Sequence, residues 1–195
     1  MSSPAKINYK IYQGSTFVQT LRWESSTKVY APITAITKSA PVVITAPNHG
    51  IPVGWRTKVT SVVGMREINS DNEYYTATAV TQNTVTLNQI NSLEYSNYTS
   101  NGVLEYNQPV DLAGYSARMQ LRERLTSPTV ITELTTQNGR IVLDNTQKTI
   151  TLTIPSSITT SLNFIQAVYS LELYTNNTVI SLASGNLSLV KEVTR

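Results

Sequence analysis

Apolar and polar side chains alternate along much of this chain, and a period of two favours β-strands over helices. In residues 115–122 every second side chain is apolar, namely Tyr115, Ala117, Met119 and Leu121. A slip of one residue would bury Arg118 and Arg122, so the register of this strand is well specified. The same alternation recurs at residues 149–154 and 166–174, whereas helical periodicity is nearly absent. We therefore predict an all-β fold.

Turn-forming dipeptides separate the predicted strands in the way that a β-sandwich requires. Asn138-Gly139 lies between the predicted strands 132–136 and 141–143, and Asn176-Asn177 marks a second hairpin further along the chain. Asn and Gly both tolerate the positive φ angles of tight turns. These signals favour a β-sandwich.

The pattern is interrupted between residues 36 and 106. Residues 1–35 and 107–195 are interpreted as one discontinuous β-sandwich, and residues 36–106 as a second β module inserted into it. The insertion contains many short predicted strands, which favours a small β-barrel, closed or half-closed. Pro32 and Pro109 lie near the two places where the chain leaves and re-enters the outer domain.

The composition excludes several classes of function. Only 14% of the 195 residues are charged, so few charges would need to be desolvated when the surface packs against a neighbour. A net charge of +3 without a run of Lys or Arg is a weak signal for nucleic acid, and we expect no such partner. The chain contains no cysteine, which excludes disulfides and thiolate chemistry. No apolar stretch is long enough to predict a membrane span.

The residues show no catalytic constellation. His49 is the single histidine, and its Asn-His-Gly-Ile-Pro context favours a turn over a catalytic base. The acidic residues Glu67, Asp71 and Glu73 do not have the spacing of a calcium-binding loop. We therefore expect no enzyme activity, no metal and no cofactor.

Three arginines form the best candidate for a charged contact surface. Arg118 and Arg122 share the polar face of one predicted strand, and Arg124 follows closely. The simpler interpretation is an exposed sheet face. The sharper hypothesis is docking onto an acidic neighbour, because the guanidinium group pairs well with carboxylates.

Three aromatic residues are the second candidate for an interface. Trp55 follows a predicted turn, and Tyr95 and Tyr98 lie in a polar loop. Exposed aromatic side chains at loop tips favour interfaces, whereas the simpler interpretation is packing inside the inserted module.

Several segments of the outer domain resemble an immunoglobulin-like domain of tailed-phage structural proteins, including the N-terminal domains of baseplate upper proteins. They are residues 12–17, 109–120, 133–135, 150–155 and 167–173. In that family a QG-x-x-F strand, a VDLTGY-x-A-x-M-x-I-R strand and a late Y-x-L-E-L strand recur. Here Ala113 replaces the usual Thr and Leu121 the usual Ile.

The insertion resembles a small β module of phage tail proteins, likened to the first catalytic-cysteine half-domain of ubiquitin-activating enzymes. The matching segments are residues 43–54, 63–69, 83–87 and 95–98. Gly54-Trp55 stands where that module usually has Gly-Asp, and the absence of cysteine excludes ubiquitin-type chemistry.

Together the two resemblances imply a structural component of a tailed-phage virion, in the tail, baseplate or neck, assembled in the host cytoplasm. The expected partners are other virion proteins, further copies of the chain in a ring, and a tail fibre. The alternative is a virion-displayed module that binds a carbohydrate or receptor, with Trp55 and Tyr95 as its stacking residues.

Overall fold

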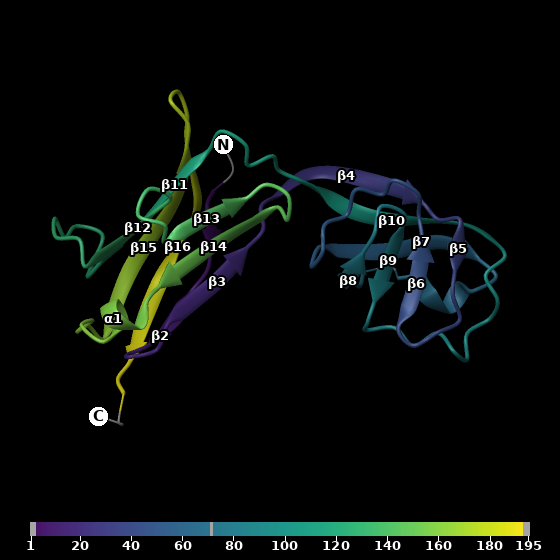
Figure 1. The fold of residues 1–195 in the computed structure, drawn as a ribbon, viewed down its shortest axis with the longest axis horizontal. Coiled ribbons are helices and arrows are strands. Elements are labelled where there is room, and N and C mark those ends of the chain that lie inside the picture. Colours follow the sequence, from purple (N-terminus) through teal and green to yellow (C-terminus); the bar gives the residue numbers. More distant parts are fainter. Residues whose placement is uncertain (1–2, 71, 193–195) are drawn as a thin grey trace. The chain divides into compact units, whose positions relative to one another are not determined.

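The computed structural model describes residues 3–70 and 72–192, and its regular secondary structure is almost entirely β-strand (Figure 1). Strands hold 51% of the residues and helices 4%, which confirms the predicted all-β fold. The helical part consists of the single turns η1 (Arg66–Ile68) and α1 (Ser156–Thr159). No helix within the described residues has the length and apolar character needed to cross a membrane.

The chain divides into two compact units. The outer unit comprises residues 1–22 and 111–195, and the inserted unit comprises residues 23–110. These boundaries differ from the predicted ones at 35/36 and 106/107. The difference arises because β4 (Glu24–Pro32) pairs with β10 (Ser100–Pro109), and β10 pairs on its other side with the insertion. Both strands therefore belong to the inserted unit.

The outer unit is a sandwich of two sheets. Its larger sheet has the order β1-β16-β15-β11-β12, and β2 also pairs with β16, in parallel. The strands are β1 (Ala5–Lys6), β2 (Tyr9–Tyr12), β11 (Ser116–Arg122), β12 (Thr132–Thr135), β15 (Gln166–Tyr174) and β16 (Val179–Val190). The smaller sheet has the order β13-β14-β3, with β13 (Ile141–Asp144), β14 (Thr149–Ile154) and β3 (Phe17–Leu21).

This connectivity is that of the immunoglobulin fold. Taken in chain order, β3, β11, β12, β13, β14, β15 and β16 occupy the places of strands B, C, C′, D, E, F and G. One sheet then contains D, E and B, and the other contains C′, C, F and G, as in the variable-type sandwich. The inserted unit therefore lies in the connection between strands B and C.

The apolar faces of the two sheets form the core of the outer unit. On β11 the buried side chains are those predicted from the alternation, Ala117, Met119 and Leu121. The neighbouring strand β15 adds the buried residues Leu171 and Leu173, and β14 of the facing sheet adds Ile150, Leu152 and Ile154. The polar side chains of β11 are thereby directed away from the second sheet.

Gly185 allows the first strands to pack against β16. A Cβ atom at Gly185 would lie 1.9 Å from the backbone oxygen of Ile7, so only glycine fits this close approach. Next to it, the amide of Ile7 donates to Ser184 O at 3.1 Å. Gly185 therefore lies at a close backbone approach within one continuous strand, β16.

The inserted unit contains one seven-stranded sheet with the order β4-β10-β7-β8-β9-β6-β5. Its remaining strands are β5 (Ala35–Ile36), β6 (Val42–Thr45), β7 (Arg56–Val63), β8 (Tyr75–Val80) and β9 (Thr84–Leu87). Among the described residues no pairing joins β4 to β5, so the predicted barrel is not closed. Closure needs matched strands around the whole circuit, and β5 is only two residues long.

Candidate interaction surface

Two of the three predicted arginines, Arg118 and Arg122, lie on the polar face of the larger sheet of the outer unit. Arg118 stands opposite Glu172 in the register of β11 and β15, and its Nη2 atom lies 2.8 Å from Glu172 Oε2. Its guanidinium carbon lies 5.6 Å from the centre of the Tyr174 ring. Arg118 is therefore already paired within its own sheet.

Arg122 holds the connection between β11 and β12. Its Nη1 atom donates to the backbone oxygens of Ser127 and Pro128, each at 2.8 Å. Its Nη2 atom donates to Gln120 Oε1 at 2.8 Å. The guanidinium of Arg122 thus has an internal, positioning role and does not offer a free fork to a partner.

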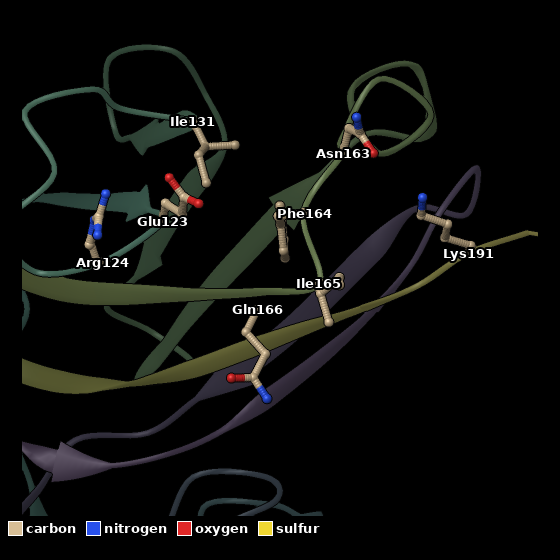
Figure 2. A pocket seen from close by; sticks show the side chains of 8 residues that line it. All are labelled: Glu123, Arg124, Ile131, Asn163, Phe164, Ile165, Gln166 and Lys191. Carbon is tan, nitrogen blue, oxygen red and sulfur yellow. The ribbon is translucent and has the colours of Figure 1, made fainter.

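Arg124 differs from the other two arginines because it lines an open groove at one end of the sandwich (Figure 2). We call this the end groove; it has a volume of about 740 Å³. It is bordered by the connection after β11, by the segment before β15 and by the residue after β16. The lining residues are Glu123, Arg124, Ile131, Asn163, Phe164, Ile165, Gln166 and Lys191.

The end groove combines a buried apolar side chain with exposed ones. Phe164 is buried, whereas the side chain of Ile165 is 82% exposed. A second hollow, of about 350 Å³, is lined by Leu125, the residue that follows Arg124 in the chain. Leu125 is 88% exposed. Burying an isoleucine or leucine side chain stabilises an assembly by about 1.5–3 kcal/mol, so these two residues favour a covered state.

The charges around the end groove are mainly positive. Arg124 and Lys191 both line it, together with one carboxylate, that of Glu123. Within residues 3–70 and 72–192 neither cation forms an ion pair. A groove with an apolar floor and two unpaired cations suits a segment that carries both apolar and acidic side chains.

Trp55 is not a surface residue, which corrects the prediction for this side chain. It is fully buried in the core of the inserted unit, and its Nε1 atom donates to Asn107 O at 2.8 Å. The reason is that Trp55 continues the alternation of β7, so it is buried on the same face as Thr57 and Val59. Stacking on an external sugar is therefore excluded for Trp55.

The two predicted tyrosines are half-buried. Tyr95 and Tyr98 both pack against the core of the inserted unit. The hydroxyl of Tyr98 donates to the backbone oxygens of Ile33 at 3.1 Å and Asn101 at 3.0 Å. Tyr98 therefore fastens its own loop, and neither ring is presented as a free platform.

His49 is a structural turn residue, as its sequence context predicted. It is buried, and its Nδ1 atom accepts from the amide of Ile51 at 2.9 Å. The other nitrogen, Nε2, must then carry the proton, and it donates to Thr84 O at 3.2 Å. Both ring nitrogens are occupied, so no lone pair is left for a metal or a substrate.

Two of the predicted acidic residues, Glu67 and Glu73, each accept a hydrogen bond from a neighbouring hydroxyl. Glu67 Oε1 accepts from the amide and hydroxyl of Ser96, and hydrogen bonds from backbone amides and from this hydroxyl lower the pKa of the carboxyl. Glu73 accepts from the hydroxyl of Tyr75. Asp71 lies outside the described residues. Across residues 3–70 and 72–192 no group of three His, Asp or Glu side chains is arranged to hold a metal.

One cluster in the inserted unit has no counterpart in the sequence-based predictions. Three cations surround the ring of Tyr74, and they are Lys28, Arg56 and Lys58 at 5.2, 5.4 and 6.0 Å from its centre. Glu105 lies 3.1 Å from Lys28 Nζ and 3.2 Å from Lys58 Nζ, and Glu24 lies 2.6 Å from Arg56 Nη2. The cluster is largely neutralised and joins neighbouring strands of the sheet.

Comparison with known protein families and with curated proteins finds no match for this chain. The fold and its candidate surface therefore define an all-β protein of two units, a sandwich with immunoglobulin strand order and an inserted open sheet.

Proposed function

We propose that this chain is a non-enzymatic structural component of a tailed-phage virion, located in the tail, baseplate or neck. The resemblance of two nested sequence patterns to phage tail modules supports this assignment. The low content of charged residues also supports it, because large parts of the surface can be buried at little desolvation cost.

The outer unit supplies the docking contact in this proposal. The observation that carries it is the end groove, where Arg124 and Lys191 form no ion pair with any described residue and Ile165 is exposed. A neighbouring virion protein would insert an apolar side chain beside Phe164 and place carboxylates next to the two cations. The inserted unit makes the second contact, with a neighbouring subunit or a tail fibre.

Copies of the chain would occupy equivalent positions on a symmetric ring. Each contact can then be modest, because several copies bound to one ring raise the effective concentration of every further contact. The end groove fits this role better than that of a tight isolated binding site, since it is open.

The first test is quantitative mass spectrometry of purified virions, compared with separated heads and tails. We expect a fixed copy number that agrees with the symmetry of the tail, and enrichment in the tail fraction. Absence of the chain from particles would overturn the virion assignment.

The second test addresses the end groove by charge reversal. The variant R124E/K191E should fail to join particles assembled in an extract that lacks the natural chain. The control K10E/K38E changes the charge equally at two exposed lysines outside the groove. If both variants are incorporated like the unchanged chain, docking through the end groove is wrong, whereas the virion assignment is judged by the mass spectrometry alone.

A further inference from the structure

The edge strands of this molecule are protected against pairing in different degrees. Charged residues and prolines on an edge strand oppose the addition of another strand. Five edge strands carry at least one such residue. They are β4 with Glu24, Lys28 and Pro32, β2 with Lys10, β12 with Glu133, β13 with Asp144 and β1 with Lys6. Within the described residues, β3 is the one edge strand of more than two residues that contains neither a charged residue nor a proline.

The outer edge of β3 is open because the N-terminal strands pair elsewhere. β1 and β2 both join β16 in the larger sheet, so they leave β3 with one partner, β14. Gln19 faces the inner side of the sheet opposite Leu152, yet it is exposed. No segment therefore covers this edge at its midpoint.

The backbone groups on the open edge can be identified from the register. The amide of Thr153 donates to Arg140 O, so the odd-numbered residues of β14 point towards β13. The even-numbered residues of β14 then point towards β3, and Leu152 is paired with Gln19. Consequently the N–H and C=O groups of Val18 and Thr20 point outward. No hydrogen bond within the described residues occupies them.

We propose that β3 pairs with β3 of a second copy of this chain, antiparallel and about a twofold axis through Gln19. In this register Val18 of each copy stands opposite Thr20 of the other, and each such pair exchanges two backbone hydrogen bonds. The three-stranded sheets of two copies would then form one continuous six-stranded sheet. A second copy is the natural occupant because the strand is self-complementary in this register.

The side chains of β3 agree with this pairing. Val18 and Thr20 lie on the outward face, and a pair of β-branched residues packs well across two strands. No charge of one copy faces a like charge of the other between Phe17 and Leu21, since this segment is uncharged. The two Gln19 amides meet on the axis and can hydrogen-bond to each other.

The register is tested with a single introduced thiol, since the natural chain has no cysteine. In Q19C the two Cα atoms would be about 4.5 Å apart, a separation that a disulfide spans. In the matched control V18C the two cysteines would be diagonal neighbours about 7–8 Å apart, too far to bridge without backbone movement. We expect Q19C to form a disulfide-linked dimer at least about tenfold faster than V18C under mild oxidation. Equal rates would overturn the proposed register.

The dimer itself is tested by sedimentation velocity over a range of protein concentrations. We expect a concentration-dependent monomer–dimer equilibrium for the natural chain. The variant V18K/T20K places lysine opposite lysine across the new pair and should be monomeric. The control V142K/V179K adds the same charge at two other exposed valines and should still dimerise. A natural chain that remains monomeric at all concentrations would overturn the proposal. It would be overturned even if β3 were then found to bind a strand of a different protein.

This pairing does not depend on the virion assignment. Both experiments use the purified full chain alone, so their failure leaves the proposed function untouched. Conversely, a dimer would form whether or not the chain is found in particles.

Discussion

Three aromatic side chains of the inserted unit are fastened by hydrogen bonds within that unit, whereas the outer unit leaves two large apolar side chains almost fully in solvent. In the insertion, Trp55, Tyr98 and Tyr106 all donate to backbone oxygens of the same unit. In the outer unit, Leu125 and Ile165 are almost fully exposed on connections at one end of the sandwich. The difference indicates that the outer unit carries the contact surface that is completed by another molecule.

The largest effect is expected from removing the central aromatic residue of the insertion. Trp55→Ala leaves a cavity in a fully buried site and should lower the free energy of unfolding of the inserted unit by about 3–5 kcal/mol. Hydrogen exchange resolved by peptide should show lost protection in residues 23–110 and retained protection in the outer unit. The control Tyr30→Ala removes an exposed ring from the same unit. Equal loss of protection in both units would show that the two are not independently stabilised.

A substitution at Gly185 should weaken the outer unit instead. Gly185→Ala places a methyl group against the backbone oxygen of Ile7 and should cost about 2–3 kcal/mol, because backbone atoms must move apart. The control Gly139→Ala adds the same methyl group in open space at φ +72°, and should cost only about 1 kcal/mol. Denaturant unfolding of both variants measures the difference. Equal losses would contradict the importance of the close approach.

Arg122→Ala should loosen the connection that borders the end groove. The side chain's hydrogen bonds to Ser127 and Pro128 would be lost at a cost of about 1 kcal/mol, because water replaces them at this partly exposed site. Amide exchange in residues 123–131 should become faster. Arg118→Ala is the matched control, since its ion pair with Glu172 is partly exposed and does not involve this connection. Unchanged exchange in 123–131 would refute the positioning role.

The smallest effect concerns pH and the insertion. Burial alone would raise the pKa of the Glu105 carboxyl, but hydrogen bonds from Lys28 and Lys58 outweigh it and hold the pKa below its ordinary value. The stabilisation is therefore complete above the ordinary pKa of glutamate, and it is lost as the pH falls through the lower folded-state value. Unfolding of the natural chain in a pH series should show this loss.

The variant Glu105→Gln should have a flatter pH profile in the same acidic range, because its side chain does not titrate. Glu94→Gln provides the control at an exposed position of the same unit. An unchanged slope for Glu105→Gln would show that other carboxylates account for the acid sensitivity.

Local alternation was enough to predict the strands that build the core of the sandwich. Residues 116–122 bury every second side chain as expected, because one face of this strand packs against the second sheet. The interface hypothesis for Trp55 was wrong, and it rested on the turn that Pro52 and Gly54 indicate just before this residue. The signal was nevertheless present, since Trp55, Thr57 and Val59 continue a period of two into β7.

Other features depend on distant contacts and were outside the reach of sequence patterns. The polar sequence of β4 gives little indication that it pairs with β10. The predicted start of the insertion, residue 36, therefore lies after β4 and not before it. In the sequence, Arg122 and Arg118 show the same alternation on one strand. In the structure, Arg122 donates to the connection after β11, whereas Arg118 pairs with Glu172 on the neighbouring strand β15. The end groove arises from three segments that only the folded sandwich brings together.

The insertion enters and leaves through two paired strands, and this has a consequence for how the chain folds. Glu24 stands opposite Pro109, and the amide of Val110 donates to Trp23 O at 3.0 Å. Once the insertion has folded, these paired strands therefore keep Arg22 and Asp111, where the first segment of the sandwich ends and the second begins, close together. Before that, residues 1–22 must find residues 111–195 across a long unstructured loop, at a greater entropic cost. We expect the sandwich to assemble fastest when the insertion folds first.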